Sequence, residues 1–156
     1  MATIIRNLIQ YNGIDTCRYN TENFKQVNVS DTFCIPIVKP DIEQIVKVWS
    51  EAEICNYEIV KTPVATSLEG QILTGYKLVI MGNVKMKFEY VALEKTQSVH
   101  TAHTIVPFCG YIVLPKEFNP IAVVLPNVSI EDIHVQQLGE RCIYSSLAML
   151  LSAEIC

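Results

Sequence analysis

Residues 82–91 read Gly82-Asn-Val-Lys-Met-Lys-Phe-Glu-Tyr-Val91, and this stretch indicates the fold more clearly than any other. Apolar side chains at 84, 86, 88 and 90 alternate with polar side chains at 83, 85, 87 and 89. A period of two predicts a β-strand with one buried face and one wet face. The apolar run at 76–81 predicts a more buried part of the same strand, where Gly75 and Gly82 permit a bulge or a close backbone approach.

Other segments with strand character lie on both sides of this one. Segment 51–60 has mixed faces, which indicates an edge or interface strand, and 68–75 reads as a connection into the strand at 76–91. Prolines punctuate the C-terminal half, which suits short strands joined by turns. There we predict strands at 98–108, 110–114, 121–125 and 128–135.

For three further segments, the sequence leaves the strand pairing or the type of secondary structure open. Thr3–Tyr11 and Lys25–Val29 have strand character, and we expect them to pair across the polar stretch between them. In 39–46, Pro40 and acidic residues come before or between Ile42 and Ile45, which allows a single helical turn. Residues 142–151 contain good helix formers and also alternate tolerably, so their pattern allows helix or strand.

The composition favours sheet over helix. The chain has 156 residues, the usual size of one domain, with nineteen Ile and seventeen Val against eleven Leu. Side chains branched at Cβ fit a pleated surface. We therefore predict an all-β fold in one domain spanning residues 1–156, an antiparallel β-sandwich or open barrel with at most short helical turns.

Charge and hydropathy exclude several classes of partner. The formal net charge is −4, and the 12 Lys and Arg form no cluster, so we expect no nucleic-acid partner. No apolar run reaches the ~18 residues that cross a bilayer, so we expect no membrane insertion. The N-terminus lacks a charged n-region and a continuous apolar stretch, so we expect synthesis in the cytoplasm without a signal peptide.

Six cysteines are many for a cytosolic chain of this size. None has C-x-x-C spacing, so neither a zinc ribbon nor a thioredoxin-type pair is indicated. Six thiols allow about fifteen pairings, and buried, reduced thiols are the alternative. The final residue is the best placed to join a neighbouring molecule. The candidate disulfide cysteines are Cys17, Cys34, Cys55, Cys109, Cys142 and Cys156.

Residues with catalytic or metal-binding chemistry are scattered. His100 and His103 are three residues apart, so on a strand they point to opposite faces and do not easily share an ion. A nucleophilic pair of Cys109 with either histidine lacks a local group that would activate the thiol. The glycines are isolated and form no phosphate loop. We therefore predict no catalytic site, no metal site and no cofactor, and hence no enzyme.

Several motifs occur in an order that resembles a known family. The first is Cys34-Ile-Pro-Ile-Val-Lys-Pro-Asp-Ile-Glu-Gln-Ile45, followed by Gly82–Val91, Gln97–His100, Val106–Phe108, Val128–Ile133 and Glu140-Arg141 before an apolar run. Together they resemble the SPOCS domain of clostridial spore-coat and spore-morphogenesis proteins. The resemblance covers residues 33–152 and leaves 1–32 as an N-terminal strand or arm. The residues carried over from its motifs are Pro36, Lys39, Pro40, Asp41, Ile42, Ile45 and Arg141.

The resemblance has departures as well as agreements. The family often carries Ser or another small polar residue where this chain has Cys109. Many members add a cell-wall-binding LysM module, which these residues do not contain. The resemblance also favours strand at 142–151.

The resemblance implies a non-catalytic structural protein of the bacterial spore envelope, in the coat, the exosporium or a spore-surface filament. Such a protein is made in the mother-cell cytoplasm and ends in the spore surface layers, where thiols meet oxidising conditions late. We expect self-assembly through strand edges and the N-terminal arm, with intersubunit disulfides and other spore-envelope proteins as partners. The alternative is a monomeric adaptor that binds a spore morphogenetic protein or a cell-wall glycan.

Overall fold

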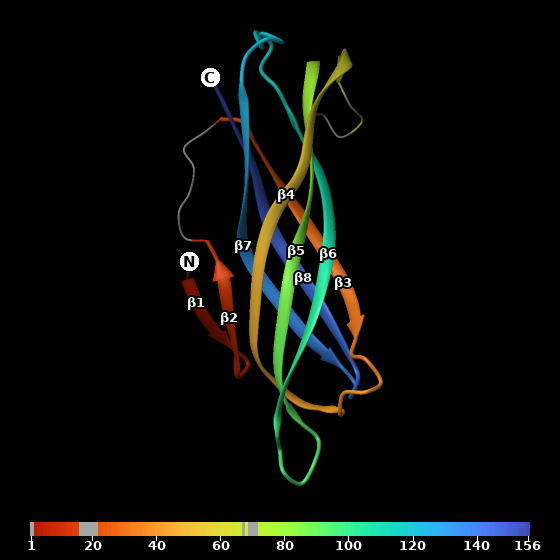
Figure 1. Ribbon diagram of the computed structural model, residues 1–156. Coiled ribbons are helices and arrows are strands. Elements are labelled where there is room, and N and C mark those ends of the chain that lie inside the picture. Colours follow the sequence, from red (N-terminus) through yellow and green to blue (C-terminus); the bar gives the residue numbers. More distant parts are fainter. Residues whose placement is uncertain (1, 16–21, 67, 69–71) are drawn as a thin grey trace.

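The computed structural model describes residues 2–15, 22–66, 68 and 72–156. Within these residues every regular element is a strand, and there is no helix with the length and apolar character that a membrane span requires. The strands form two sheets that lie one over the other (Figure 1). The predicted β-sandwich is therefore confirmed, and the sheets do not close into the alternative barrel.

The two sheets differ in size. The five-stranded sheet contains, in spatial order, β1 (Ala2–Arg6), β2 (Ile9–Ile14), β4 (Ile42–Thr66), β5 (Ile72–Ala92) and β6 (Val99–Val113). The three-stranded sheet contains, in spatial order, β3 (Phe24–Cys34), β8 (Cys142–Ile155) and β7 (Val124–Leu138). Neighbouring strands are antiparallel, except that β2 runs parallel to β4.

Alternation along the strands builds the core between the sheets. On β5 the side chains of Val84, Phe88 and Tyr90 are fully buried, while the polar residues between them face outward. On β8 the alternation is the same, with Leu147 and Met149 buried against β5 and its neighbours. Each such side chain contributes about 1.5–3 kcal/mol on burial. The strands predicted at 76–91 and 142–151 are therefore confirmed.

Gly82 allows β5 to pass through a crowded point. A Cβ atom there would lie 2.1 Å from the Glu53 carbonyl oxygen and 2.6 Å from Cζ of Phe108, so only glycine fits without displacement. Gly75 has φ +112° and lies close to the register shift between Lys61 and Val64. Both glycines therefore have the roles that the sequence predicted.

Several predicted boundaries in the second half were wrong. The segments 98–108 and 110–114 form one continuous strand, β6, because a proline is tolerated in a strand at the border of a sheet. The strand predicted at 121–125 begins only at Val124, since a hydrogen bond from the Ala122 N–H to the Asn119 carbonyl closes a turn before it. The connection predicted at 68–75 is shorter, because β5 already begins at Ile72.

The helical turn predicted at 39–46 was also wrong. Ile42, Ile45 and Val48 are buried at a spacing of three, which resembles the face of a helix. The chain is instead a strand with register shifts between Ile42 and Gln44 and between Ile45 and Lys47. Each bulge adds one residue, so side chains three apart reach the same face of the sheet.

The predicted pairing of Thr3–Tyr11 with Lys25–Val29 was wrong as well. Residues 2–14 form their own hairpin, in which β1 pairs with β2 around Asn7 and Leu8, both with positive φ. Two such residues suit the tight turn that joins twisted strands. Lys25–Val29 lies in the other sheet and pairs with β8, which contributes a row of buried apolar side chains to the core.

Candidate functional site

Most of the motif residues singled out in the sequence lie at the connection between the two sheets. The segment Ile35–Asp41 connects β3 of the three-stranded sheet to β4 of the five-stranded sheet at one end of the sandwich. A hydrogen bond from the Lys39 N–H to the Pro36 carbonyl, at 3.0 Å, closes a turn within it. Prolines on both sides of this turn restrict the backbone, so the crossover takes a defined path.

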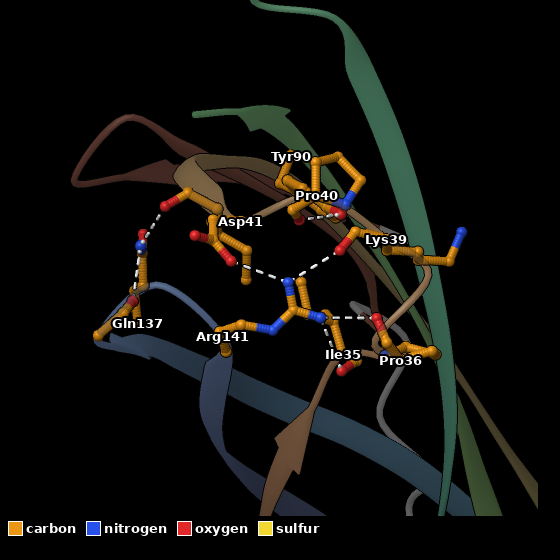
Figure 2. Close-up of polar contacts among 10 residues, drawn as sticks. Ile35, Pro36, Lys39, Pro40, Asp41, Tyr90, Gln137 and Arg141 are labelled. Carbon is orange, nitrogen blue, oxygen red and sulfur yellow. Dashed lines mark hydrogen bonds and ion pairs between the residues drawn. The ribbon is translucent and has the colours of Figure 1, made fainter. Parts of the chain in front are cut away.

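Arg141 fastens this crossover from the start of β8. Its Nη1 donates to the Lys39 carbonyl and to Oδ1 of Asp41, both at 2.8 Å, and its Nη2 donates to the Pro36 carbonyl at 2.7 Å (Figure 2). A second, longer bond from Nη2 reaches the carbonyl of Ile35 at 3.4 Å. The planar guanidinium offers donors in a fixed fork, so one side chain binds several carbonyls of one turn.

Tyr90 approaches the same segment from β5. Its hydroxyl donates to the Pro40 carbonyl at 2.9 Å (Figure 2), and its ring stacks on the ring of His100 at 5.9 Å. Burial raises the pKa of Tyr90 above its ordinary value of 10.0, while the nearby Arg141 guanidinium opposes that shift. The phenol is therefore held in its neutral, donating form.

Gln137 completes the set from the end of β7. Its Nε2 donates to the carbonyl of Ile42 at 3.0 Å and to that of Gly139 at 2.8 Å. The Ile42 N–H in turn donates to the Glu140 carbonyl at 2.7 Å. We call the segment Ile35–Asp41 with Arg141, Tyr90 and Gln137 the crossover clasp. No sequence signal pointed to Tyr90 or Gln137 here, because both belong to alternating strands whose polar contacts depend on distant segments.

A disulfide reinforces the crossover clasp. Cys34, the last residue of β3, is bonded to Cys142, the first residue of β8 and the neighbour of Arg141. The two residues are paired across the strands, although 108 positions separate them in sequence. Among the six candidate cysteines this is the pair that the fold brings together, while Cys55, Cys109 and Cys156 carry free, exposed thiols and Cys17 lies outside the described residues.

The crossover clasp is a structural lock. Its guanidinium group, carbonyls and carboxylate satisfy one another, and the side chain of Lys39 extends away from Arg141 (Figure 2). Pro36 and Pro40 set the turn, Asp41 accepts from Arg141, and Ile42 and Ile45 are anchors in the core. The motif residues therefore support the crossover and the core.

The histidines and cysteines considered for catalysis lie apart. His100 is opposite Tyr90 on the inner face of β6, whereas His103 is opposite Lys87 on the outer face. Cys109 shares the outer face with His103 but lies six residues further along β6, about 20 Å at strand spacing. Within the described ranges no three His, Cys, Asp or Glu residues are grouped as metal ligands would be.

A long part of β4 has no neighbouring strand along one edge among the described residues. β2 pairs with β4 only through Gln10–Asn12 and Lys47–Trp49. Beyond that point, from Glu51 to Thr66, the described residues place β5 on one side of β4 and no strand on the other. We call Glu51–Thr66 the free β4 edge. Its backbone groups on that side are a template for pairing with another chain.

Comparison with known proteins agrees with the order of motifs. Residues 41–138 match the family model described as "SipL, SPOCS domain". The matched stretch begins at Asp41 in the crossover clasp and runs through β4, β5, β6 and β7. No curated protein and no solved structure shows significant similarity to the chain.

Proposed function

The chain belongs to the SPOCS domain family, which makes it a sporulation-related protein, and on that premise we propose that it is a non-catalytic structural component of the spore envelope. In this proposal it assembles with further copies of itself in the surface layers of the spore. The observation that carries the proposal is the free β4 edge. The crossover clasp and the disulfide make the sandwich rigid, and a rigid sheet with an open edge is suited to adding strands.

The N-terminal hairpin limits where this assembly occurs. Its β2 covers β4 up to Trp49, and its own outer strand, β1, is only five residues long. Arg6 of the hairpin forms an ion pair with Asp132 of β7 at 2.8 Å, and the Asp15 N–H donates to the Ile130 carbonyl. Short edge strands are poor templates. In this proposal the arm therefore confines pairing along β4 to Glu51–Thr66.

The free β4 edge pairs with the same edge of a second copy across a two-fold axis in this proposal. A two-fold contact uses one surface twice and yields a dimer. β6, at the opposite border of the sheet, is a weaker template because Pro107 lacks an N–H and interrupts its row of donors.

Exposed thiols would join such dimers covalently. Cys55 lies in the β4 bulge at the free edge, with its sulfur 3.2 Å from Nδ2 of Asn83. Cys109 and Cys156 are exposed at other places on the sandwich. In an oxidising layer, thiols at contacts already made would form intersubunit disulfides. This accounts for exposed cysteines in a chain that is made before the spore is released.

Two adjacent proline substitutions test the edge. Successive N–H groups of a strand point to opposite sides, so one of Glu58→Pro and Ile59→Pro removes a bond to β5 and the other removes an N–H from the free edge. Urea unfolding identifies the edge variant as the more stable of the two. We expect that variant to sediment as a monomer where the wild type associates. Association of the edge variant equal to wild type would refute edge pairing.

A second experiment separates covalent from non-covalent assembly. Purified protein is imaged by electron microscopy with and without reductant, and the same samples are run on non-reducing gels. We expect oxidised dimers that disappear in Cys55→Ser and persist in Cys109→Ser. Dimers that are lost in Cys109→Ser but not in Cys55→Ser would place the contact away from β4.

The alternative function, a monomeric adaptor, is favoured by one feature of the crossover clasp. Ile37 and Val38 at its turn are 95% and 92% exposed. Adjacent exposed apolar side chains of this kind mark contacts with partners. Sedimentation under oxidising conditions distinguishes the two functions, because a stable monomer at every concentration supports the adaptor and an associating species supports assembly.

A further inference from the structure

A row of side chains crosses the outer face of the five-stranded sheet at the end of β2. Pairing registers place Asn12 of β2 beside Trp49 of β4, Trp49 beside Lys87 of β5, and Lys87 beside His103 of β6. Directly paired residues point to the same face of a sheet. Four strands therefore present one indole and three hydrogen-bonding side chains in a line.

The row borders a hollow of about 460 Å³, which is within the range of small-ligand sites. It forms where β2 leaves β4: Gly13 has φ +105°, and a Cβ there would lie 2.0 Å from the Ser50 carbonyl oxygen. Its lining includes Asn12, Trp49, Glu51, Met86, Lys87 and His103, and we call this site the Trp49 hollow.

Charges around the Trp49 hollow are mixed. Lys85 forms an ion pair with Glu53 at 3.3 Å, which leaves the Glu51 carboxylate and the Lys87 ammonium at the hollow and the Lys47 ammonium beside it. The ammonium groups of Lys87 and Lys47 lie 4.8 and 5.8 Å from the centre of the Trp49 ring. These contacts hold the indole in place between the two strands. A site for phosphate or for another strong anion would instead combine several positive charges with no carboxylate among them.

We propose that the Trp49 hollow binds the sugar rings of an uncharged, hydroxyl-rich glycan. Trp49 lines the hollow, so its indole offers aromatic surface to the C–H groups of a pyranose ring beside the two ammonium groups. Hydroxyl groups both donate and accept, and the hollow offers an acceptor in Glu51, donors in Lys87, and both in Asn12 and His103. The lining surface is mostly apolar with hydrogen-bonding groups around it, which matches a sugar ring with its C–H faces and its rim of hydroxyls.

The proposal goes beyond assembly, because it gives the outer face of the sheet a ligand of its own. The Trp49 hollow lies beside β2, at the start of the free β4 edge, and needs only residues of one chain. The edge variant among the two proline substitutions should therefore keep glycan binding when it loses association. Failure of one proposal does not imply failure of the other.

The chain contains a single tryptophan, so its fluorescence reports on this site alone. We would titrate the full chain with a tetramer of N-acetylglucosamine and, separately, with a tetramer of glucose, exciting where tyrosine does not absorb. The expected result is a saturable change in intensity with at least one of them, little affected by salt. Because each substitution replaces a charged hydrogen-bonding group by a neutral amide, Lys87→Gln and Glu51→Gln should weaken binding by about fivefold to tenfold.

Lys77→Gln is the matched control. Lys77 lies over the Tyr111 ring at 5.0 Å on the same strand as Lys87, outside the Trp49 hollow, so its loss should leave the titration unchanged. No saturable change with either tetramer up to about 10 mM would overturn the proposal. A response that only acidic polysaccharides give and that salt abolishes would also overturn it, since that result indicates simple charge attraction.

Discussion

Arg141 shows at the residue scale how one side chain joins the two sheets. It lies at the start of β8, yet its bonds reach a turn that is about a hundred residues earlier in the chain. Its side chain is 35% exposed and that of Asp41 is 40% exposed, so water weakens their mutual attraction. The bonds to the backbone carbonyls then contribute more than the ion pair does.

Replacing Arg141 tests the crossover clasp. We expect Arg141→Ala to lower the free energy of unfolding by about 1–3 kcal/mol, because three carbonyls and a carboxylate lose a donor. Arg141→Lys should recover only part of the loss, since an ammonium lacks the planar fork. The measurement is the urea concentration at the midpoint of unfolding, compared between variants whose unfolding free energy has the same dependence on urea. Lys39→Ala is the control, and equal midpoints for Arg141→Ala and Lys39→Ala would contradict this role.

Tyr90 makes the clasp sensitive to alkaline pH. Burial raises its pKa above 10.0 in the folded state, so the folded chain holds the phenolic proton more tightly than the unfolded chain does. The resulting stabilisation is complete below about pH 10, the pKa of an unfolded tyrosine, and is lost as pH rises through the higher folded pKa. Urea midpoints from neutral to alkaline pH should fall more steeply for wild type than for Tyr90→Phe. Tyr57→Phe, at an exposed position, should follow wild type.

At the scale of single elements, β4 combines two environments in one strand. Its first part lies between β2 and β5, and its later part, the free β4 edge, is paired on one side only. Mixed faces at 51–60 indicated this from the sequence, because a strand with neither face buried does not need strict alternation, and no residue from Glu51 to Thr66 is buried.

Hydrogen exchange of β4 should show this division. In a monomer, amides of Glu51–Thr66 that point away from β5 have no partner strand and should exchange rapidly, whereas amides of Val84–Tyr90 in β5 should be protected. Association should slow the exchange of these exposed β4 amides and leave the exchange of the β5 amides unchanged. Exchange that stays rapid along β4 in the associated protein would place the interface elsewhere.

At the scale of the whole molecule, the disulfide closes a long loop of the chain. Cys34 and Cys142 are 108 positions apart and enclose all of β4, β5, β6 and β7. Removing the bond by the double substitution Cys34→Ser and Cys142→Ser should reduce the free energy of unfolding by about 3–5 kcal/mol, since a long loop regains its freedom when unfolded. Thermal or urea unfolding measures this, and Cys109→Ser, an exposed free thiol, should change little. A double variant as stable as wild type would mean that the bond does not constrain the unfolded chain.

The sequence by itself determined the local character of this protein. Alternation at 82–91, the excess of Cβ-branched residues and the position of Gly82 predicted strands, an all-β sandwich and a close backbone approach. The order of motifs also predicted the family, which the match over 41–138 confirms. Each of these features depends on residues that are near one another in the sequence, so the sequence alone predicts it.

Only the tertiary structure decided which segments meet. It paired β3 with β8, selected Cys34 and Cys142 among the cysteines, and placed Arg141 on the crossover. It also brought Asn12, Trp49, Lys87 and His103 into one row. Register between distant strands depends on bulges and on the fit of two buried faces, and neither is a periodic property of one segment.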